Sequence, residues 1–163
     1  MIDAEMRALA ERVLAACRAR KWTIATAESC TGGLVAGALT EIAGSSDVVD
    51  RGFVTYSNAA KMALLGVPEA TLEAHGAVSR QTAEAMAQGA LARSDVDLTV
   101  AITGVAGPGG GSAEKPVGLV HFAAAAKDGR LIHREKHYGD IGRSEVRRRS
   151  VIEALDLLLE FAR

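Results

Sequence analysis

The feature that most constrains this chain is its alternation of strand-like and helix-like segments. Apolar residues recur at helical spacing over 3–20, and short β-prone runs at 22–26 and 51–56 are each followed by a further helical pattern. A third run, at 97–103, leads into a glycine-rich loop. Alternation of this kind is typical of layered α/β folds.

The last third of the chain predicts a different kind of strand connection. Residues 117–126 and 131–138 read as two strands joined by a hairpin at Asp128-Gly129, and a helix from about 144 to 162 follows. Crossover helices together with a hairpin require a mixed sheet. We therefore expect one α/β domain over residues 1–163, a three-layer sandwich with a mixed β-sheet of about five strands flanked by helices on both faces.

Composition excludes several classes of function. A net charge of −1 gives no bulk attraction to nucleic acid or to acidic membranes. Cys17 and Cys30 form no CxxC pair, so neither a disulfide framework nor a zinc site is expected. The first helical segment lacks the apolar core of a signal peptide, and no later run reaches membrane-spanning length. These features predict a cytoplasmic protein without nucleic-acid or membrane partners.

Three loops, each after a predicted strand, carry the residues suited to chemistry. The first, at 28–33, reads Glu-Ser-Cys-Thr-Gly-Gly and opens a helix. A serine there has backbone N–H groups converging near it, which can stabilise an oxyanion or bind phosphate. The alternative is a helix cap, in which Ser29 or Thr31 only satisfies free N–H groups.

The second loop, at 56–61, reads Tyr-Ser-Asn-Ala-Ala-Lys. Lys61 falls in the first turn of a predicted helix, where a cation opposes the macrodipole. Partial desolvation would also favour the neutral amine, which can take a proton from a serine. The alternative is a lysine side chain that extends into water.

The third loop, at 103–112, has glycine at five of its ten positions, which suits a nest of N–H groups around an anion. It matches neither the GxxxxGK[ST] loop nor a GxGxxG fingerprint, and a mobile connection is the alternative. Because ligands gather at the carboxyl ends of strands in open sheets, we expect the three loops to meet there.

Other constellations are set aside. His133 and His137 would lie on one face of a strand but roughly 13 Å apart, too far to share a metal. His75 and His121 lack acidic partners at a ligand-like spacing, and no GxSxG elbow is present. Cys30 is a rival nucleophile if its thiolate is stabilised by the helix N-terminus, and a small buried thiol otherwise.

Together these segments resemble the CinA C-terminal family, the nicotinamide-nucleotide amidohydrolases. The resemblance spans about residues 5–160 in a series of ordered blocks. The blocks are Ala27–Gly33, Arg51–Asn58 with Lys61, His75–Ser79, Thr103–Pro108 and Lys115–Gly118.

The resemblance implies hydrolysis of the carboxamide of nicotinamide mononucleotide to nicotinate mononucleotide and ammonia, without cofactor or metal. It identifies Ser29 as the nucleophile, Lys61 as the general base and Tyr56 as an assisting residue, and it suggests a homodimer. Many members carry a larger N-terminal domain, whereas this chain begins at the amidohydrolase domain. The candidate substrate-binding residues are Cys30, Thr31, Gly32, Gly33, Asn58, Thr103, Gly104, Gly107 and Arg143.

This sequence departs from the family pattern at one place, and it leaves the phosphate ligand, the substrate and the function each with alternatives. The family pattern often reads Gly-Asp-Arg before the last helix, but here Ile141-Gly142 separates Asp140 from Arg143, so either Arg143 or Arg147 is available to the phosphate. The mononucleotide, the riboside and free nicotinamide share the same amide. A module that binds a pyridine nucleotide without turnover, and a structural partner of DNA-uptake or recombination proteins, are the competing functions.

Overall fold

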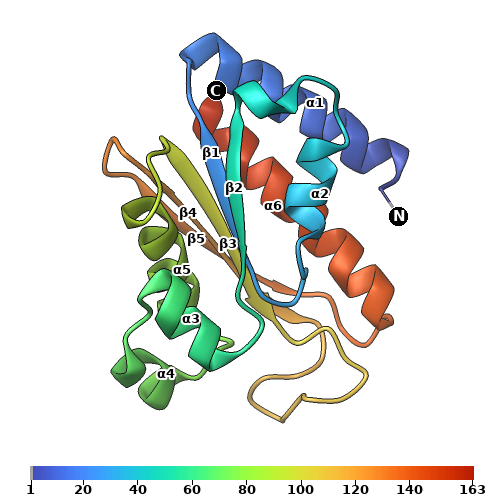
Figure 1. The fold of residues 1–163 in the computed structure, drawn as a ribbon. Helices are drawn as coiled ribbons and strands as arrows, with labels where there is room; N and C mark the ends of the chain where they lie inside the picture. Colours follow the sequence, from blue (N-terminus) through green and yellow to red (C-terminus); the bar gives the residue numbers. More distant parts are fainter. Residues whose placement is uncertain (1) are drawn as a thin grey trace.

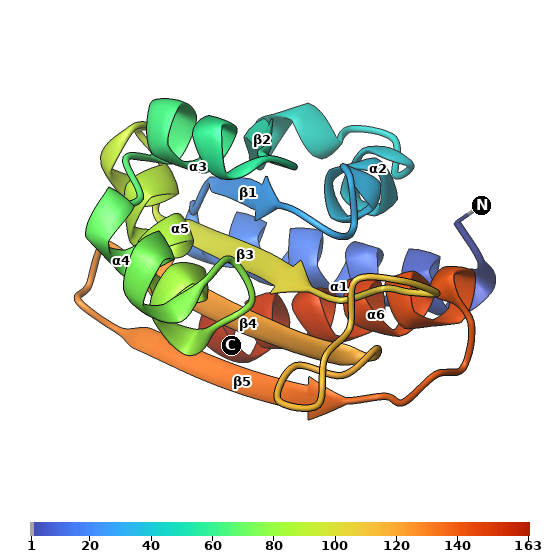
Figure 2. The same cartoon turned by 90° about the horizontal axis from the view of Figure 1, so that it is seen from below.

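The computed structural model describes residues 2–163 and places a five-stranded sheet between two layers of helices (Figures 1 and 2). In chain order the elements are α1 (Ala4–Arg20), β1 (Ile24–Glu28), α2 (Leu34–Thr40), the 3₁₀ helix η1 (Ser45–Asp47), β2 (Val49–Val54), α3 (Asn58–Leu65), α4 (Glu69–His75), α5 (Arg80–Ala92), β3 (Leu98–Gly104), β4 (Leu119–Ala126), β5 (Leu131–His137) and α6 (Arg143–Ala162). The predicted fold class is confirmed.

The sheet has the strand order β2-β1-β3-β4-β5. Strand β1 is parallel to β2 and to β3, whereas β4 is antiparallel to β3 and to β5. The mixed sheet and the β4–β5 hairpin are therefore as predicted. Because β1, β2 and β3 run in the same direction, their carboxyl ends meet at one edge, with the loop 105–118 beside them (Figure 1).

The two faces of the sheet are built from side chains of different size. Helices α1, α2 and α6 cover one face, where Ile102 and Phe122 are fully buried, and α3, α4 and α5 cover the other (Figure 2). On that second face the buried apolar strand residues are alanines, including Ala101 and Ala123, and α5 contributes further alanines. Such small side chains allow helix and sheet to approach closely.

Close packing also joins α5 to α3, the helix that carries Lys61. A Cβ built at Gly89 would lie 1.9 Å from the carbonyl oxygen of Leu65. Because backbone atoms cannot move aside at low cost, we expect Gly89→Ala to lower the free energy of unfolding by about 1–3 kcal/mol. Gly37→Ala on α2 is a matched control, because a Cβ there meets nothing within 4 Å, and it should add about 0.5–1 kcal/mol. Urea unfolding measures both, and an unchanged midpoint for Gly89→Ala would contradict this packing.

Local signals in the sequence set the helix starts. Ser57 accepts a hydrogen bond from the N–H of Ala60, and Ser79 accepts one from the N–H of Thr82, so both serines cap their helices. The predicted 22–26 strand is shifted, because it runs to Glu28, where pairing with β2 and β3 continues. Among the helices of residues 2–163, none combines the length and apolar character that crossing a bilayer demands.

Candidate active site

Ser29 and Lys61 meet at the carboxyl edge of the sheet. Ser29 directly follows β1, and its N–H donates to the carbonyl of Ile102 on β3. Lys61 lies in the first turn of α3. The Lys61 Nζ is 3.0 Å from the Ser29 Oγ, although the two residues are 32 positions apart in the chain. This geometry allows direct proton transfer between hydroxyl and amine.

The environment of Lys61 favours the neutral amine. The side chain is buried, with the residue only 1% exposed. Its second hydrogen-bond partner is the backbone carbonyl of Thr55, 2.8 Å from Nζ. Burial lowers the pKa of Lys61 below the ordinary lysine value, because desolvation penalises the ammonium form. No ion pair between Lys61 and a carboxylate is present within residues 2–163, so no partner charge offsets this cost.

A cavity of about 270 Å³ opens onto this pair. The predicted site residues that line it are Ser29, Cys30, Tyr56, Lys61, Thr103, Gly104, Gly107 and Arg143. They come from the end of β3, the segments that follow β1, β2 and β3, and the first turns of α3 and α6. The expectation that the three loops meet at the carboxyl ends of the strands is therefore confirmed.

Arg143 links two walls of the cavity. Its guanidinium donates one hydrogen bond to the carbonyl of Gly107, at 2.8 Å, and another to the hydroxyl oxygen of Tyr56, also at 2.8 Å. The two inserted residues, Ile141 and Gly142, therefore do not remove Arg143 from the site. Tyr56 is 62% exposed and stands at the mouth of the cavity.

The wall opposite Arg143 includes residues that local patterns did not single out. Ala77 and Val78, between α4 and α5, line the cavity. The Thr103 hydroxyl donates to the carbonyl of Ala77 at 2.7 Å, which ties this segment to β3. Small apolar residues carry no chemical signature, so only their place in the block 75–79 marked them.

The turn after Ser29 is held from two sides. The carboxylate of Glu28, fully buried, accepts hydrogen bonds from the N–H groups of Val35 and Ala36. On the other side, the Arg147 guanidinium donates to the carbonyl oxygens of Cys30 and Thr31. Arg147 therefore lies behind the turn and does not line the cavity, which leaves Arg143 as the arginine available to a ligand.

Some predicted binding residues do not face the cavity. Thr31, Gly32 and Gly33 are absent from its lining, although they belong to the turn that positions Ser29. Asn58 lies in a separate depression with residues of α4. Asn58 is the first residue of α3 and is absent from the lining of this cavity, so its assignment to the substrate pocket stays a prediction.

Cys30 lines the cavity but is poorly suited to act as a nucleophile. The residue is 6% exposed. Burial raises the pKa of its thiol to about 12, because the thiolate would be desolvated. A thiol that stays protonated at neutral pH is a weak nucleophile. This favours the structural reading of Cys30 over the catalytic one.

The histidines are closer together than their spacing indicated. Cross-strand pairing between β4 and β5 brings His121 Nδ1 to 2.9 Å from His133 Nε2, and His121 Nε2 to 3.6 Å from Glu135 Oε1. Spacing along the chain gave His121 no acidic partner suited to metal binding, whereas the sheet register brings Glu135 beside it. Across the described part of the chain, no three or more His, Cys, Asp or Glu residues form a group suited to a metal ion.

Comparison with known proteins relates this geometry to a family. The family model described as CinA C-terminal domain matches residues 6–162. A protein named nicotinamide-nucleotide amidohydrolase PncC from Enterobacter agglomerans is 50% identical over 160 residues, which covers 98% of this chain and 96% of that protein. The protein of the same name from Escherichia coli K12 is 52% identical over 159 residues, covering 97% and 95%.

A solved structure agrees with these relationships. The crystal structure of the competence/damage inducible protein CihA from Agrobacterium tumefaciens superposes with a TM-score of 0.98 at 56% identity, covering 100% of this chain and 99% of that one. The family model and these full-length similarities cover the whole site. The chain therefore belongs to the CinA C-terminal domain family.

Proposed function

We propose that this chain hydrolyses the carboxamide of nicotinamide mononucleotide, giving nicotinate mononucleotide and ammonia, with Ser29 as nucleophile and Lys61 as general base. The observation that carries the proposal is the 3.0 Å approach of the Lys61 Nζ to the Ser29 Oγ in a buried site. The amidohydrolase class is supported by the proteins named PncC, which match nearly the whole chain.

The first half of the reaction forms an acyl-enzyme. Neutral Lys61 accepts the hydroxyl proton of Ser29 while Oγ attacks the amide carbon. An N–H of Lys61 donates to the Thr55 carbonyl, which orients the nitrogen lone pair. N–H groups of the Cys30–Gly33 turn stabilise the developing oxyanion. Only interactions that strengthen as this charge develops lower the barrier of the chemical step.

Loss of ammonia and hydrolysis of the ester complete the cycle. An amide anion is too poor a leaving group unaided, so protonated Lys61 returns its proton to the departing nitrogen. Tyr56 assists from the mouth of the cavity, where its hydroxyl oxygen accepts a hydrogen bond from Arg143. Water then attacks the ester carbon while Lys61 takes its proton. The bond from that carbon to the Ser29 Oγ breaks, Lys61 returns the proton to Oγ, and nicotinate mononucleotide leaves.

The ribose-phosphate end of the substrate lies towards Thr103, Gly104, Gly107 and Arg143. This assignment is supported by the glycine-rich loop, whose backbone N–H groups can contact an anion, and by the guanidinium of Arg143. Arg143 donates to the carbonyl of Gly107 and to the hydroxyl oxygen of Tyr56. These are neutral acceptors, so a phosphate would be a stronger partner.

An ammonia-release assay on three amides tests the proposed function. We expect turnover of the mononucleotide to be unaffected by a metal chelator. The riboside and free nicotinamide lack the phosphate, so their kcat/KM should be roughly 10- to 100-fold lower. Tight binding of the mononucleotide without ammonia at high enzyme concentration would instead indicate a regulatory nucleotide-binding module. Inactivation by the chelator would contradict the metal-free mechanism.

A further inference from the structure

Arg147 contacts the nucleophile turn without contacting the cavity. Its Nε donates to the carbonyl of Cys30 at 3.1 Å, and its Nη2 donates to that of Thr31 at 3.3 Å. A Cβ built at Gly32 would lie 3.4 Å from the same Nη2, and φ there is +59°, so glycine allows this close approach. The guanidinium comes from α6, more than a hundred residues later in the chain.

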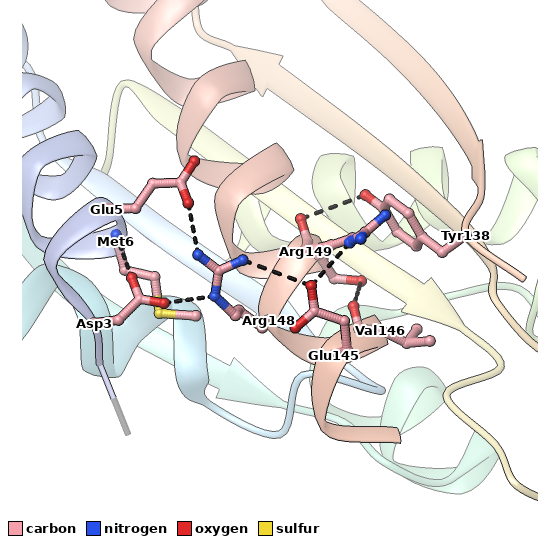
Figure 3. A network of polar contacts seen from close by, with 9 residues as sticks. Asp3, Glu5, Met6, Tyr138, Glu145, Val146, Arg148 and Arg149 are labelled. Atoms are coloured by element: carbon pink, nitrogen blue, oxygen red, sulfur yellow. Dashed lines mark hydrogen bonds and ion pairs between the residues drawn. The ribbon is translucent and has the colours of Figure 1, made fainter. Parts of the chain in front are cut away.

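Arg147 differs from its neighbours on α6 in having no carboxylate partner. Arg148 is ion-paired with Asp3 and Glu5 of the N-terminal segment, and Arg149 with Glu145 (Figure 3). Within residues 2–163, the side chain of Arg147 donates only to the two carbonyls of the turn. Its positive charge is therefore not neutralised, and it lies directly behind Ser29–Gly32.

Three carbonyl groups of this turn are engaged, those of Ser29, Cys30 and Thr31. The Ser29 carbonyl accepts from Gly32 at 3.0 Å, and Arg147 binds the next two carbonyls. No acceptor for the backbone N–H of Thr31 is present in residues 2–163. In a planar trans peptide the C=O and N–H point in opposite directions. Arg147, bound to the Cys30 carbonyl, thus directs the Thr31 N–H away from itself.

From this geometry we infer that Arg147 is a positioning residue for the oxyanion site. It fixes the Cys30–Thr31 peptide through a charge-assisted hydrogen bond, and so holds in place the backbone of Cys30, which lines the cavity where the oxyanion develops. Glu28 cannot replace it, because Glu28 binds N–H groups further along, in α2. The inference rests on Ser29 being the nucleophile of the proposed function, but not on the identity of the amide.

Phosphonylation of Ser29 by a small alkyl fluorophosphonate tests the inference independently of the substrate. The Ser29 Oγ–P bond forms, the P–F bond breaks, fluoride leaves and the hydroxyl proton passes to Lys61. Negative charge develops on the phosphoryl oxygen, so the rate reports on the oxyanion site. We expect Arg147→Gln to slow labelling by about 10- to 100-fold. In the ammonia assay kcat should fall similarly, with KM nearly unchanged because Arg147 does not line the cavity.

Arg148→Gln is the matched control. Arg148 follows Arg147 in the sequence, but it is ion-paired with Asp3 and Glu5 and does not contact the turn. The Arg148→Gln variant should therefore be labelled at the wild-type rate, even if its Tm falls. Adding guanidinium ion to Arg147→Ala should restore part of the labelling rate, which a merely structural loss would not allow.

The outcomes separate the two proposals. If Ser29 of the wild type is labelled but the mononucleotide is not hydrolysed, the proposed substrate is wrong. The labelling rate of Arg147→Gln would then still test the positioning role of Arg147. Labelling of Arg147→Gln at the wild-type rate would overturn the positioning role. A wild-type Ser29 that does not react with the fluorophosphonate would overturn both.

Discussion

Replacing Ser29 by alanine is expected to lower kcat for ammonia release from nicotinamide mononucleotide by at least about 10³-fold. The Ser29 hydroxyl lines the cavity and has a base within proton-transfer distance, because Lys61 Nζ lies 3.0 Å from its oxygen. The variant keeps the cavity walls, so binding of the mononucleotide measured by calorimetry should persist. Circular dichroism would check that the fold is intact.

Cys30→Ala is the matched control for that experiment. The thiol neighbours Ser29 and lines the same cavity, but burial raises its pKa to about 12. We therefore expect Cys30→Ala to retain most of the activity. If activity were instead lost only in the Cys30 variant, the role of nucleophile would pass to the thiol.

Replacing Lys61 by methionine should lower kcat about as much as Ser29→Ala does, but it should raise the stability of the fold. Without the amine no group accepts the Ser29 proton, and we expect a loss of at least about 10³-fold. Methionine fills a similar volume without a polar group to desolvate. The variant should therefore gain about 1 kcal/mol, or about 2–4 °C in Tm.

The pH dependence of both effects follows from the lowered pKa of Lys61. Below its pKa in the folded state, Lys61 is protonated in both the folded and the unfolded chain, and the cost of burying the charge is fully present. As pH rises from that value towards the unfolded value of 10.5, the folded chain releases its proton first and gains stability. The stability advantage of Lys61→Met should therefore shrink across this window.

Wild-type activity should change in the matching direction. Because neutral Lys61 is the base, kcat/KM should increase with pH through the pKa of Lys61, with a midpoint below 10.5. Differential scanning calorimetry and initial rates over the same pH range measure the two effects together. A midpoint at or above 10.5 would mean that Lys61 is not the desolvated base.

Most of the architecture was predictable because its signals are local. Ser57 and Ser79 cap helices within three residues of themselves, and the hairpin after β4 depends on Asp128-Gly129. Strand ends were less predictable. Glu28 reads as the start of a loop because it is charged, yet it is fully buried at the end of β1, where its carboxylate binds N–H groups of α2.

The candidate site was predictable only as a set of neighbouring loops. The sequence by itself determined which residue types follow each parallel strand, and strands that run in the same direction bring Ser29 and Thr103 to one edge. It did not determine that Asn58 lies in a depression with residues of α4, that Arg147 lies behind the turn, or that His121 touches His133.

Those contacts depend on strand register and helix packing. Helix capping and hydrophobic periodicity depend on residues within one or two turns of each other, so both can be read from a short stretch of sequence. The distance from α6 to the Ser29 turn instead depends on how α6 packs on the sheet beside α1 and α2. The tertiary structure alone decided that Arg143 reaches the cavity while Arg147, one helical turn later, supports the turn from behind.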